Sequence, residues 1–135
     1  MANRSDRLKR ILRVQEQLKA MHEMRRANEL RAAHKAEAEA AEIASGKDTD
    51  ATLSRLFPEL YERAIVRAHD KRDRHLQAAR READNIARET ARTDRVGQDY
   101  RAAVRVEERA AEERSALETV ERLLGLPPSR GGGNG

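Results

Sequence analysis

Cysteine is absent from the 135 residues, and aromatic side chains are rare, with one Phe, two Tyr and no Trp. Without cysteine, the chain has no disulfide, thiolate metal ligand or cysteine nucleophile. Leu, Ile, Val and Phe together number 23, about 17% of the residues. That share is too small for a thick globular core.

Glycine and proline are nearly missing from residues 5–124, where only Gly46, Pro58 and Gly97 occur. Ala, Glu, Lys, Leu and Arg supply 79 of the 135 residues, a composition typical of long helices and coiled coils. The sequence therefore predicts an all-α protein with a thin helical seam in place of a core.

Long apolar runs are also absent. None approaches the roughly 20 residues of a membrane-spanning helix, and the N-terminus lacks the apolar core of a secretion signal. We therefore expect a cytoplasmic protein that would reach a membrane only through its partners.

Charge is distributed unevenly along the chain, although the net charge is only +4. Residues 1–35 carry a net charge of +6, residues 36–62 carry −5, and residues 63–135 carry +3. The N-terminal segment is thus electropositive and the middle of the chain is acidic.

The helix signals predict two long antiparallel helices that form a coiled-coil hairpin. Ser5 is a candidate N-cap with Asp6 in the first turn, Gly46 suits a helix end, and Pro58 suits a helix start. A short helical turn carrying Leu53 and Leu56 is expected between the long helices. The expected segments are a flexible 1–4, helix one at about 5–45, a turn at 46–57, helix two at about 58–124, and a disordered tail at 125–135.

Heptad spacing predicts which side chains form the seam between the helices. Helix one would contribute Ile11, Leu18, Arg25 and Ala32 at one position and Val14, Met21 and Asn28 at the other. Helix two would contribute Leu76, Ala83, Thr90, Gly97, Val104 and Ala111 at one position and Ala79, Ile86, Thr93 and Tyr100 at the other. Contacting residues would have numbers that sum to about 104.

Gly97 costs roughly 1 kcal/mol in a helix interior relative to alanine, so it marks a break, a hinge or a close approach of helices. A continuous helix is favoured, with Gly97 opposite Arg7. In this register, residues from about Tyr100 to Leu124 have no partner in helix one. The apolar side chains that would then be exposed are Val104, Ala111, Leu117, Val120, Leu123 and Leu124, and such a stripe is typical of a binding surface.

Catalytic and metal sites find no support in the sequence. His22, His34, His69 and His75 form no metal-ligand spacing and are interpreted as solvated surface side chains. The glycine-rich stretch "SRGGGNG" neither follows a strand nor opens a helix, so it is not a phosphate loop. We expect no enzyme activity and no cofactor, and we expect Phe57 and Tyr61 to pack the turn.

The basic N-terminus carries Arg4, Arg7, Lys9, Arg10 and Arg13 within ten residues. Such cations can contact nucleic-acid phosphates, but no aromatic side chain is present there to stack on bases. An acidic protein surface is therefore favoured as the partner, and nucleic acid is not expected.

Two stretches carry a resemblance to a known family: "RLKRILRVQEQLKAMHEMRRANEL" near the start and "YRAAVRVEERAAEERSALETVERLL" at the end of helix two. With the short turn between them, residues 5–124 resemble the flagellar export protein FliJ and its type III secretion counterparts of the YscO kind. Helix one is short for that family.

The resemblance implies a chaperone-like coiled-coil component of a flagellar or type III protein export apparatus, which binds a hexameric export ATPase and contacts the membrane export gate. The ATPase-facing residues would be Arg7, Leu8, Arg10, Ile11, Arg13, Leu117, Val120, Leu123 and Leu124. The gate-facing residues would be Ala68, Arg72, His75, Leu76 and Ala79. The alternatives are a self-associating structural coiled coil and a basic helical nucleic-acid-binding protein.

Overall fold

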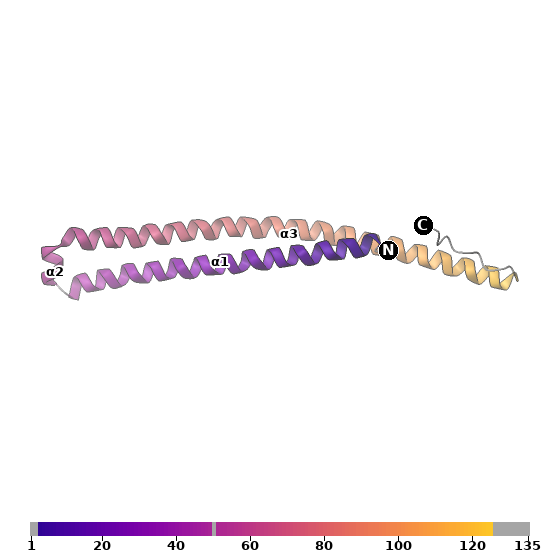
Figure 1. Ribbon diagram of the computed structural model, residues 1–135, viewed down its shortest axis with the longest axis horizontal. Helices are drawn as coiled ribbons and strands as arrows, with labels where there is room; N and C mark the ends of the chain where they lie inside the picture. Colours follow the sequence, from indigo (N-terminus) through magenta and orange to yellow (C-terminus); the bar gives the residue numbers. More distant parts are fainter. Residues whose placement is uncertain (1–2, 50, 126–135) are drawn as a thin grey trace. The chain divides into compact units, whose positions relative to one another are not determined.

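The computed structural model describes residues 3–49 and 51–125, which divide between two units. Unit 1 contains Met1–Arg13 and Asp94–Gly135, and unit 2 contains Val14–Thr93. Three helices follow one another, α1 (Arg4–Thr49), α2 (Ala51–Leu56) and α3 (Pro58–Leu123), and the described residues include no strand (Figure 1). The predicted all-α helical hairpin is confirmed.

Asn3, rather than Ser5, caps the start of α1. The backbone N–H of Asp6 donates to Asn3 Oδ1 at 3.0 Å, which satisfies one of the N–H groups that a helix start leaves without an internal partner. The prediction that Ser5 is the cap is wrong by two residues. Ser5 is instead buried against α3.

Gly46 does not end α1, which continues to Thr49. Among the described glycines only Gly125 has a positive φ, of 70°, so Gly46 keeps a helical backbone and the predicted stop there is wrong. The predicted helical turn with Leu53 and Leu56 corresponds to α2. Pro58 opens α3 as expected, since its missing N–H costs nothing in a first turn.

Gly125 terminates α3 at its C-terminal end. Its N–H donates to the carbonyl of Arg122 at 3.2 Å, and the positive φ places it in the left-handed conformation that favours glycine at a helix end. The predicted disordered tail begins at this residue, and the remainder of it lies outside the described residues.

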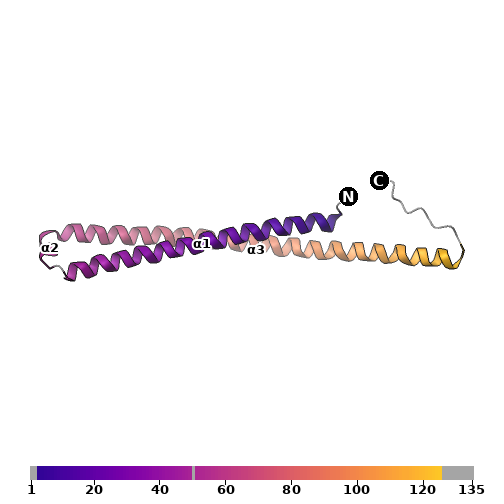
Figure 2. The same ribbon diagram turned by 60° about the horizontal axis from the view of Figure 1, so that its bottom comes forward.

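In unit 2, α1 and α3 lie side by side and antiparallel, and α2 connects them (Figures 1 and 2). The buried apolar side chains are small: Ala33, Ala36 and Ala40 from α1 and Ala68 and Ala79 from α3. Alanine at these positions lets the helix backbones approach closely. The result is the thin seam that the composition predicts.

The seam of α1 is one residue out of phase with the prediction. The buried set Ala33, Ala36 and Ala40 continues toward the N-terminus at heptad spacing through Glu29 and His22, which are half-buried. Three larger apolar residues upstream lie on a flank, because their spacing follows a phase one residue earlier. Ile11, Val14 and Leu18 are accordingly 45, 54 and 38% exposed, so their assignment to the seam is wrong.

One of the two predicted seam positions of α3 is correct, and the other is wrong by one residue. Ala79 is buried, and Ile86, Thr93 and Tyr100 are half-buried, as their predicted seam position requires. The second position is occupied by His75, Glu82 and Glu89, one residue before the predicted Leu76, Ala83 and Thr90. Ala83 and Ala111 are exposed, so they do not belong to the seam, whereas Leu76, Thr90 and Val104 are half-buried beside it.

Gly97 lies within α3, which passes through it without a break. This glycine is buried, but a Cβ added there would meet only the Arg101 guanidinium, at 3.5 Å. Because that distance is an ordinary van der Waals contact, no neighbouring backbone requires a glycine here. The predicted continuous helix is confirmed, whereas the proposed close approach to Arg7 is not supported.

None of the helices, over the described residues, is long and apolar enough to cross a membrane.

Candidate partner-binding surfaces

Within unit 1 the start of α1 is fastened to α3 by a pair that we name the Ser5–Glu107 clasp. Ser5 donates from its hydroxyl to Glu107 Oε2 at 2.6 Å and from its backbone N–H to Oε1 at 3.2 Å. The carboxylate thus satisfies a first-turn N–H and places negative charge at the positive end of the helix dipole. Asn3 Oδ1 also lies 2.9 Å from the Ser5 hydroxyl.

Beyond the clasp, α3 continues as a segment that we name the extension, residues 108–123. Every side chain from 108 to 120 is exposed. The sequence predicts an overhang from about Tyr100, but Tyr100 and Val104 are half-buried and Ala103 is buried. The pairing of α1 with α3 extends to Glu107. The overhang therefore begins about two turns later than expected.

The exposed apolar side chains at and beyond the clasp follow a heptad pattern. Val106, Ala110, Leu117, Val120 and Leu124 are spaced by three, four or seven residues, and Leu117, Val120 and Leu124 are 54, 49 and 67% exposed. Residues so spaced share one face of a helix. The unpaired part of α3 therefore presents an apolar stripe with no covering helix among the described residues.

The ATPase-facing set predicted from the resemblance lies entirely in unit 1. Arg7, Arg10 and Arg13 are exposed, Leu8 is half-buried in the seam, and Ile11 is exposed on a flank. Leu117, Val120, Leu123 and Leu124 are all exposed on the extension and its end. Apart from Leu8, these side chains are accessible to a partner.

The predicted gate-facing set does not form an accessible surface. Ala68 and Ala79 are buried in the seam, and Leu76 is half-buried beside it. Arg72 lies 4.0 Å from Glu37 of α1, and His75 Nδ1 lies 2.6 Å from Glu29 Oε2. These residues therefore face α1. His75 occupies the seam position that the prediction assigned to the following residue.

Histidine–carboxylate pairs bridge the two helices of unit 2 at two levels. His22 of α1 contacts Glu82 of α3, and His75 of α3 contacts Glu29 of α1, each at 2.6 Å. Both pairs have residue numbers that sum to 104, as the predicted register requires, although Lys71–Glu39 and Arg72–Glu37 sum to 110 and 109. The interpretation of His22 and His75 as merely solvated is therefore wrong.

The first of these pairs perturbs its carboxylate. The hydrogen bond from His22 holds the pKa of Glu82 below its ordinary value of 4.5, against the opposing effect of desolvation, and Asn85 and Arg25 add to the lowering. A seam glutamate is thereby kept ionised. Sequence periodicity missed these positions because it scores apolar side chains only.

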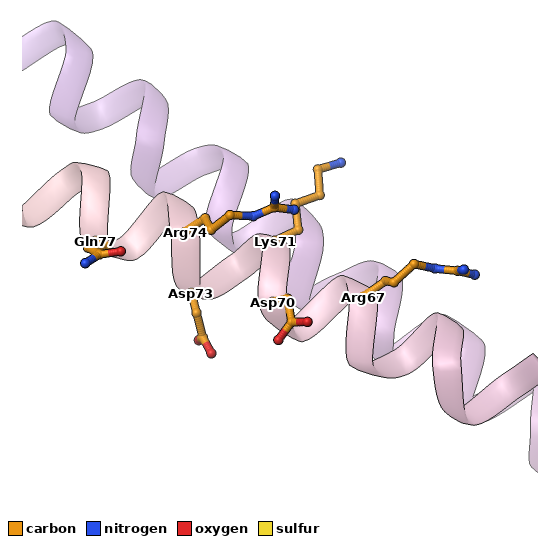
Figure 3. A pocket seen from close by; sticks show the side chains of 6 residues that line it. All are labelled: Arg67, Asp70, Lys71, Asp73, Arg74 and Gln77. Carbon is orange, nitrogen blue, oxygen red and sulfur yellow. The ribbon is translucent and has the colours of Figure 1, made fainter. Parts of the chain in front are cut away.

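No described group of three or more His, Asp or Glu side chains is arranged to hold a metal ion. A shallow surface depression on α3 is lined by Arg67, Asp70, Lys71, Asp73, Arg74 and Gln77. Figure 3 shows that its basic and acidic side chains point in different directions. They do not converge on a common point as catalytic groups would.

A cluster that the sequence interpretation missed lies where α2 meets α3. Leu53, Leu56, Phe57 and Leu60, which we name the apolar tip, are 44, 66, 50 and 57% exposed. Phe57 therefore does not pack the turn as predicted, whereas Tyr61 is half-buried. The spacing i, i+3, i+4, i+7 of the four residues was the available signal.

Comparison with known proteins identified no matching family model, curated protein or solved structure.

Proposed function

We propose that this protein is a non-enzymatic helical hairpin that binds a partner through the extension of α3, and that the partner is an export ATPase of a flagellar or type III protein export apparatus. The exposed apolar stripe of the extension carries the proposal. Leu117, Val120 and Leu124 lie on one helix face that nothing described covers, and such a face is expected to be buried in a complex.

Charge adds a second element to the proposed docking surface. Arg7, Arg10 and Arg13 are exposed in the same unit and would meet acidic side chains of a partner. Rim charges of this kind act mainly on association rate and orientation. The apolar stripe would then supply most of the affinity, because buried apolar anchors dominate binding.

Coupling of the ATPase to the membrane export gate belongs to the same proposal. The predicted gate-facing residues lie in or beside the seam, and a partner would reach the buried ones only by separating α1 from α3. The gate contact therefore has no assigned residues in the proposal.

Self-association is the second candidate, and the same heptad stripe favours it. Two extensions that paired would bury Leu117, Val120 and Leu124 against each other. Sedimentation should then show a stable dimer that Val120→Asp abolishes. A nucleic-acid binder would instead lose affinity steeply with salt and with Arg7, Arg10 and Arg13 changed to Ala.

The test is a pull-down with the purified protein from nuclease-treated lysate of its own organism at moderate salt. The proposal predicts recovery of a secretion ATPase, lost with Leu117→Asp/Val120→Asp. The matched control is Ser115→Asp/Thr119→Asp, which adds the same charge on the opposite face of α3. Equal loss with both variants, or recovery of only the protein itself, would refute the ATPase assignment.

A further inference from the structure

The extension of α3 continues the heptad pattern of the seam beyond the point where α1 begins. In unit 1 the covered part of the seam ends with Ala103, which is buried, and with Glu107, which the clasp holds. Steps of seven residues lead from these two positions along the extension to its end. The first set is Ala110, Leu117 and Leu124, and the second is Arg114 and Glu121. The extension therefore presents the helix face that α1 covers earlier in α3.

A shallow depression marks the place where α1 stops covering this face. It is lined by Asn3, Glu107, Ala110, Glu113, Arg114 and Leu117, all of which belong to unit 1. Asn3 directly precedes α1, and the other five residues belong to α3. The depression thus begins at the start of α1 and follows α3 into the extension.

Heptad spacing determines the kind of segment that fits this face. Side chains spaced alternately by three and four residues form ridges and gaps that match those of a second helix at a shallow crossing angle. The same face of α3 already packs against a helix where α1 covers it. Residues 108–123 span about 24 Å, which accommodates roughly four turns of another helix.

Arg114 determines the charge that such a helix must carry. Its side chain lies between Ala110 and Leu117 on the seam face, and it forms no ion pair with any other residue that the structure describes. A helix laid on this face would remove much of the water around Arg114, and a charge buried without a partner is costly. One heptad earlier, Ser5 of α1 donates to Glu107. The covering helix therefore needs an acidic side chain at the level of Arg114.

A second copy of the extension does not meet this requirement. In a parallel pair each heptad position faces itself, so Arg114 would lie beside Arg114 and Glu121 beside Glu121. In an antiparallel pair that aligns the apolar residues, Arg114 would lie level with Leu117, and Glu121 would lie level with Ala110. Like charges repel, and apolar neighbours leave a charge unpaired. The charge pattern therefore favours a different protein over a dimer of extensions.

We propose that a helix of a partner protein lies along the extension in line with α1, and that it places an acidic side chain against Arg114. Its apolar side chains would pack on Ala110, Leu117 and Leu124. This inference rests on the proposed function in one respect, which is that the extension binds a partner. It deepens that function by stating the secondary structure, the position and the charge of the segment that the partner contributes.

The experiment begins with an aliphatic photo-crosslinking amino acid at Leu117 of the full-length chain, expressed in its own organism. Ser115 is the control position, because it is exposed on another face of α3. Mass spectrometry of the adduct formed at position 117 maps the crosslinked segment of the partner. A synthetic peptide of that segment is then titrated with the purified full-length chain.

The peptide should become helical when it binds, which circular dichroism measures. Arg114→Glu should lower the affinity for the peptide about tenfold or more, because an acidic side chain would then face another. The matched control Arg105→Glu makes the same charge change at an exposed residue on the opposite face of α3, and it should change the affinity less than about twofold. Replacing the acidic residue of the peptide with Arg should restore binding to the Arg114→Glu chain.

Four results would overturn this inference. They are an adduct of the chain with itself, the same adducts or none at positions 117 and 115, a peptide that binds without becoming helical, and equal effects of Arg114→Glu and Arg105→Glu. A crosslinked helix from a protein other than an export ATPase would count against the ATPase assignment alone. Recovery of the ATPase in equal amounts by the parent and the Arg114→Glu chain would count against this inference alone.

Discussion

Individual polar side chains occupy seam positions of unit 2 where a coiled coil usually carries aliphatic ones. His22, Glu29, His75 and Glu82 pair across the helices, so each of these side chains has a hydrogen-bond partner. Such pairs add little net stability, because both partners must lose water. We infer that their main effect is to disfavour other registers, in which these groups would be buried without partners.

Thr93 is a seam residue whose hydroxyl oxygen is buried without a hydrogen-bond partner among the described residues. Thr93→Val removes this polar atom and keeps the shape of the side chain. We expect the free energy of unfolding to rise by about 1 kcal/mol, because the cost of an unsatisfied buried group is removed. Denaturant titration followed by circular dichroism measures the change.

Thr119→Val is the control for that measurement. The Thr119 hydroxyl is exposed and donates to the carbonyl of Ser115 at 2.9 Å, so its loss should change the free energy of unfolding by less than about 0.5 kcal/mol. A Thr93→Val variant that is less stable than the parent would contradict the assignment of an unsatisfied hydroxyl.

Glu82 should make stability depend on pH in the acid range. Its pKa is lowered in the folded state, so its contribution is fully present above the ordinary value of 4.5 and is lost as pH falls through the lowered value. The melting temperature of Glu82→Gln should thus lie below that of the parent at pH 6, and the gap should narrow below about pH 4.5.

The exposed Glu108 provides the comparison for this titration. Glu108→Gln should leave a melting-temperature difference that does not vary with pH over the same range. If the Glu82→Gln gap stayed constant down to pH 3, the His22–Glu82 bond would not be the source of the lowered pKa.

Elements differ in how far the sequence predicts them. The two long helices follow from composition and from the scarcity of glycine and proline, and they are confirmed. The helix ends were less certain, because Gly46 is compatible with both a stop and a helix interior. Ser5 illustrates the same limit, since its use as a cap or as a contact to Glu107 depends on a residue far away in sequence.

Side-chain phase was the least predictable property of the helices. Ile11, Val14 and Leu18 form a regular apolar set, yet the alanines near the end of α1 determine which face packs. Small side chains permit the closest approach of backbones, and hydrophobicity scores underrate that effect. Polar seam residues such as Glu82 compounded the error, as they gave no apolar signal.

Gly97 is a position at which a substitution should stabilise the α3 helix. Gly97→Ala should raise the free energy of unfolding by about 1 kcal/mol, because alanine loses less backbone entropy in a helix. The added methyl would meet only the flexible Arg101 guanidinium, at 3.5 Å. Thermal unfolding followed at 222 nm measures the effect.

The alternative account of Gly97 makes the opposite prediction. If a close helix approach required glycine, Gly97→Ala would destabilise the protein, and Gly97→Leu would do so more strongly. Gly46→Ala is a suitable reference, since a Cβ there meets nothing within 4 Å.

Across the whole molecule, the exposed apolar surfaces were harder to predict than the fold. The apolar stripe of the extension was predictable because it continues a heptad pattern of α3 beyond the level at which α1 begins. The apolar tip was not, because apolar residues in a turn look like packing residues until their exposure is known.

Hydrogen exchange should distinguish the packed and unpacked parts of α3. Backbone amides of residues 110–121 should exchange at least about tenfold faster than those of residues 79–93, because helices without tertiary packing are only marginally stable. Mass spectrometry of deuterated peptides resolves the two ranges. Equal protection would mean that the extension is covered in solution, as a dimer would require.

The Ser5–Glu107 clasp also has a consequence for how such a chain can change in length. Insertions before Glu107 in α3 must be matched in α1, or the pairing is lost. Seven residues inserted after Glu107 would lengthen the extension by about 10 Å and would leave every paired residue in place. The clasp therefore fixes the pairing of the helices, and the length of the extension can change independently of that pairing.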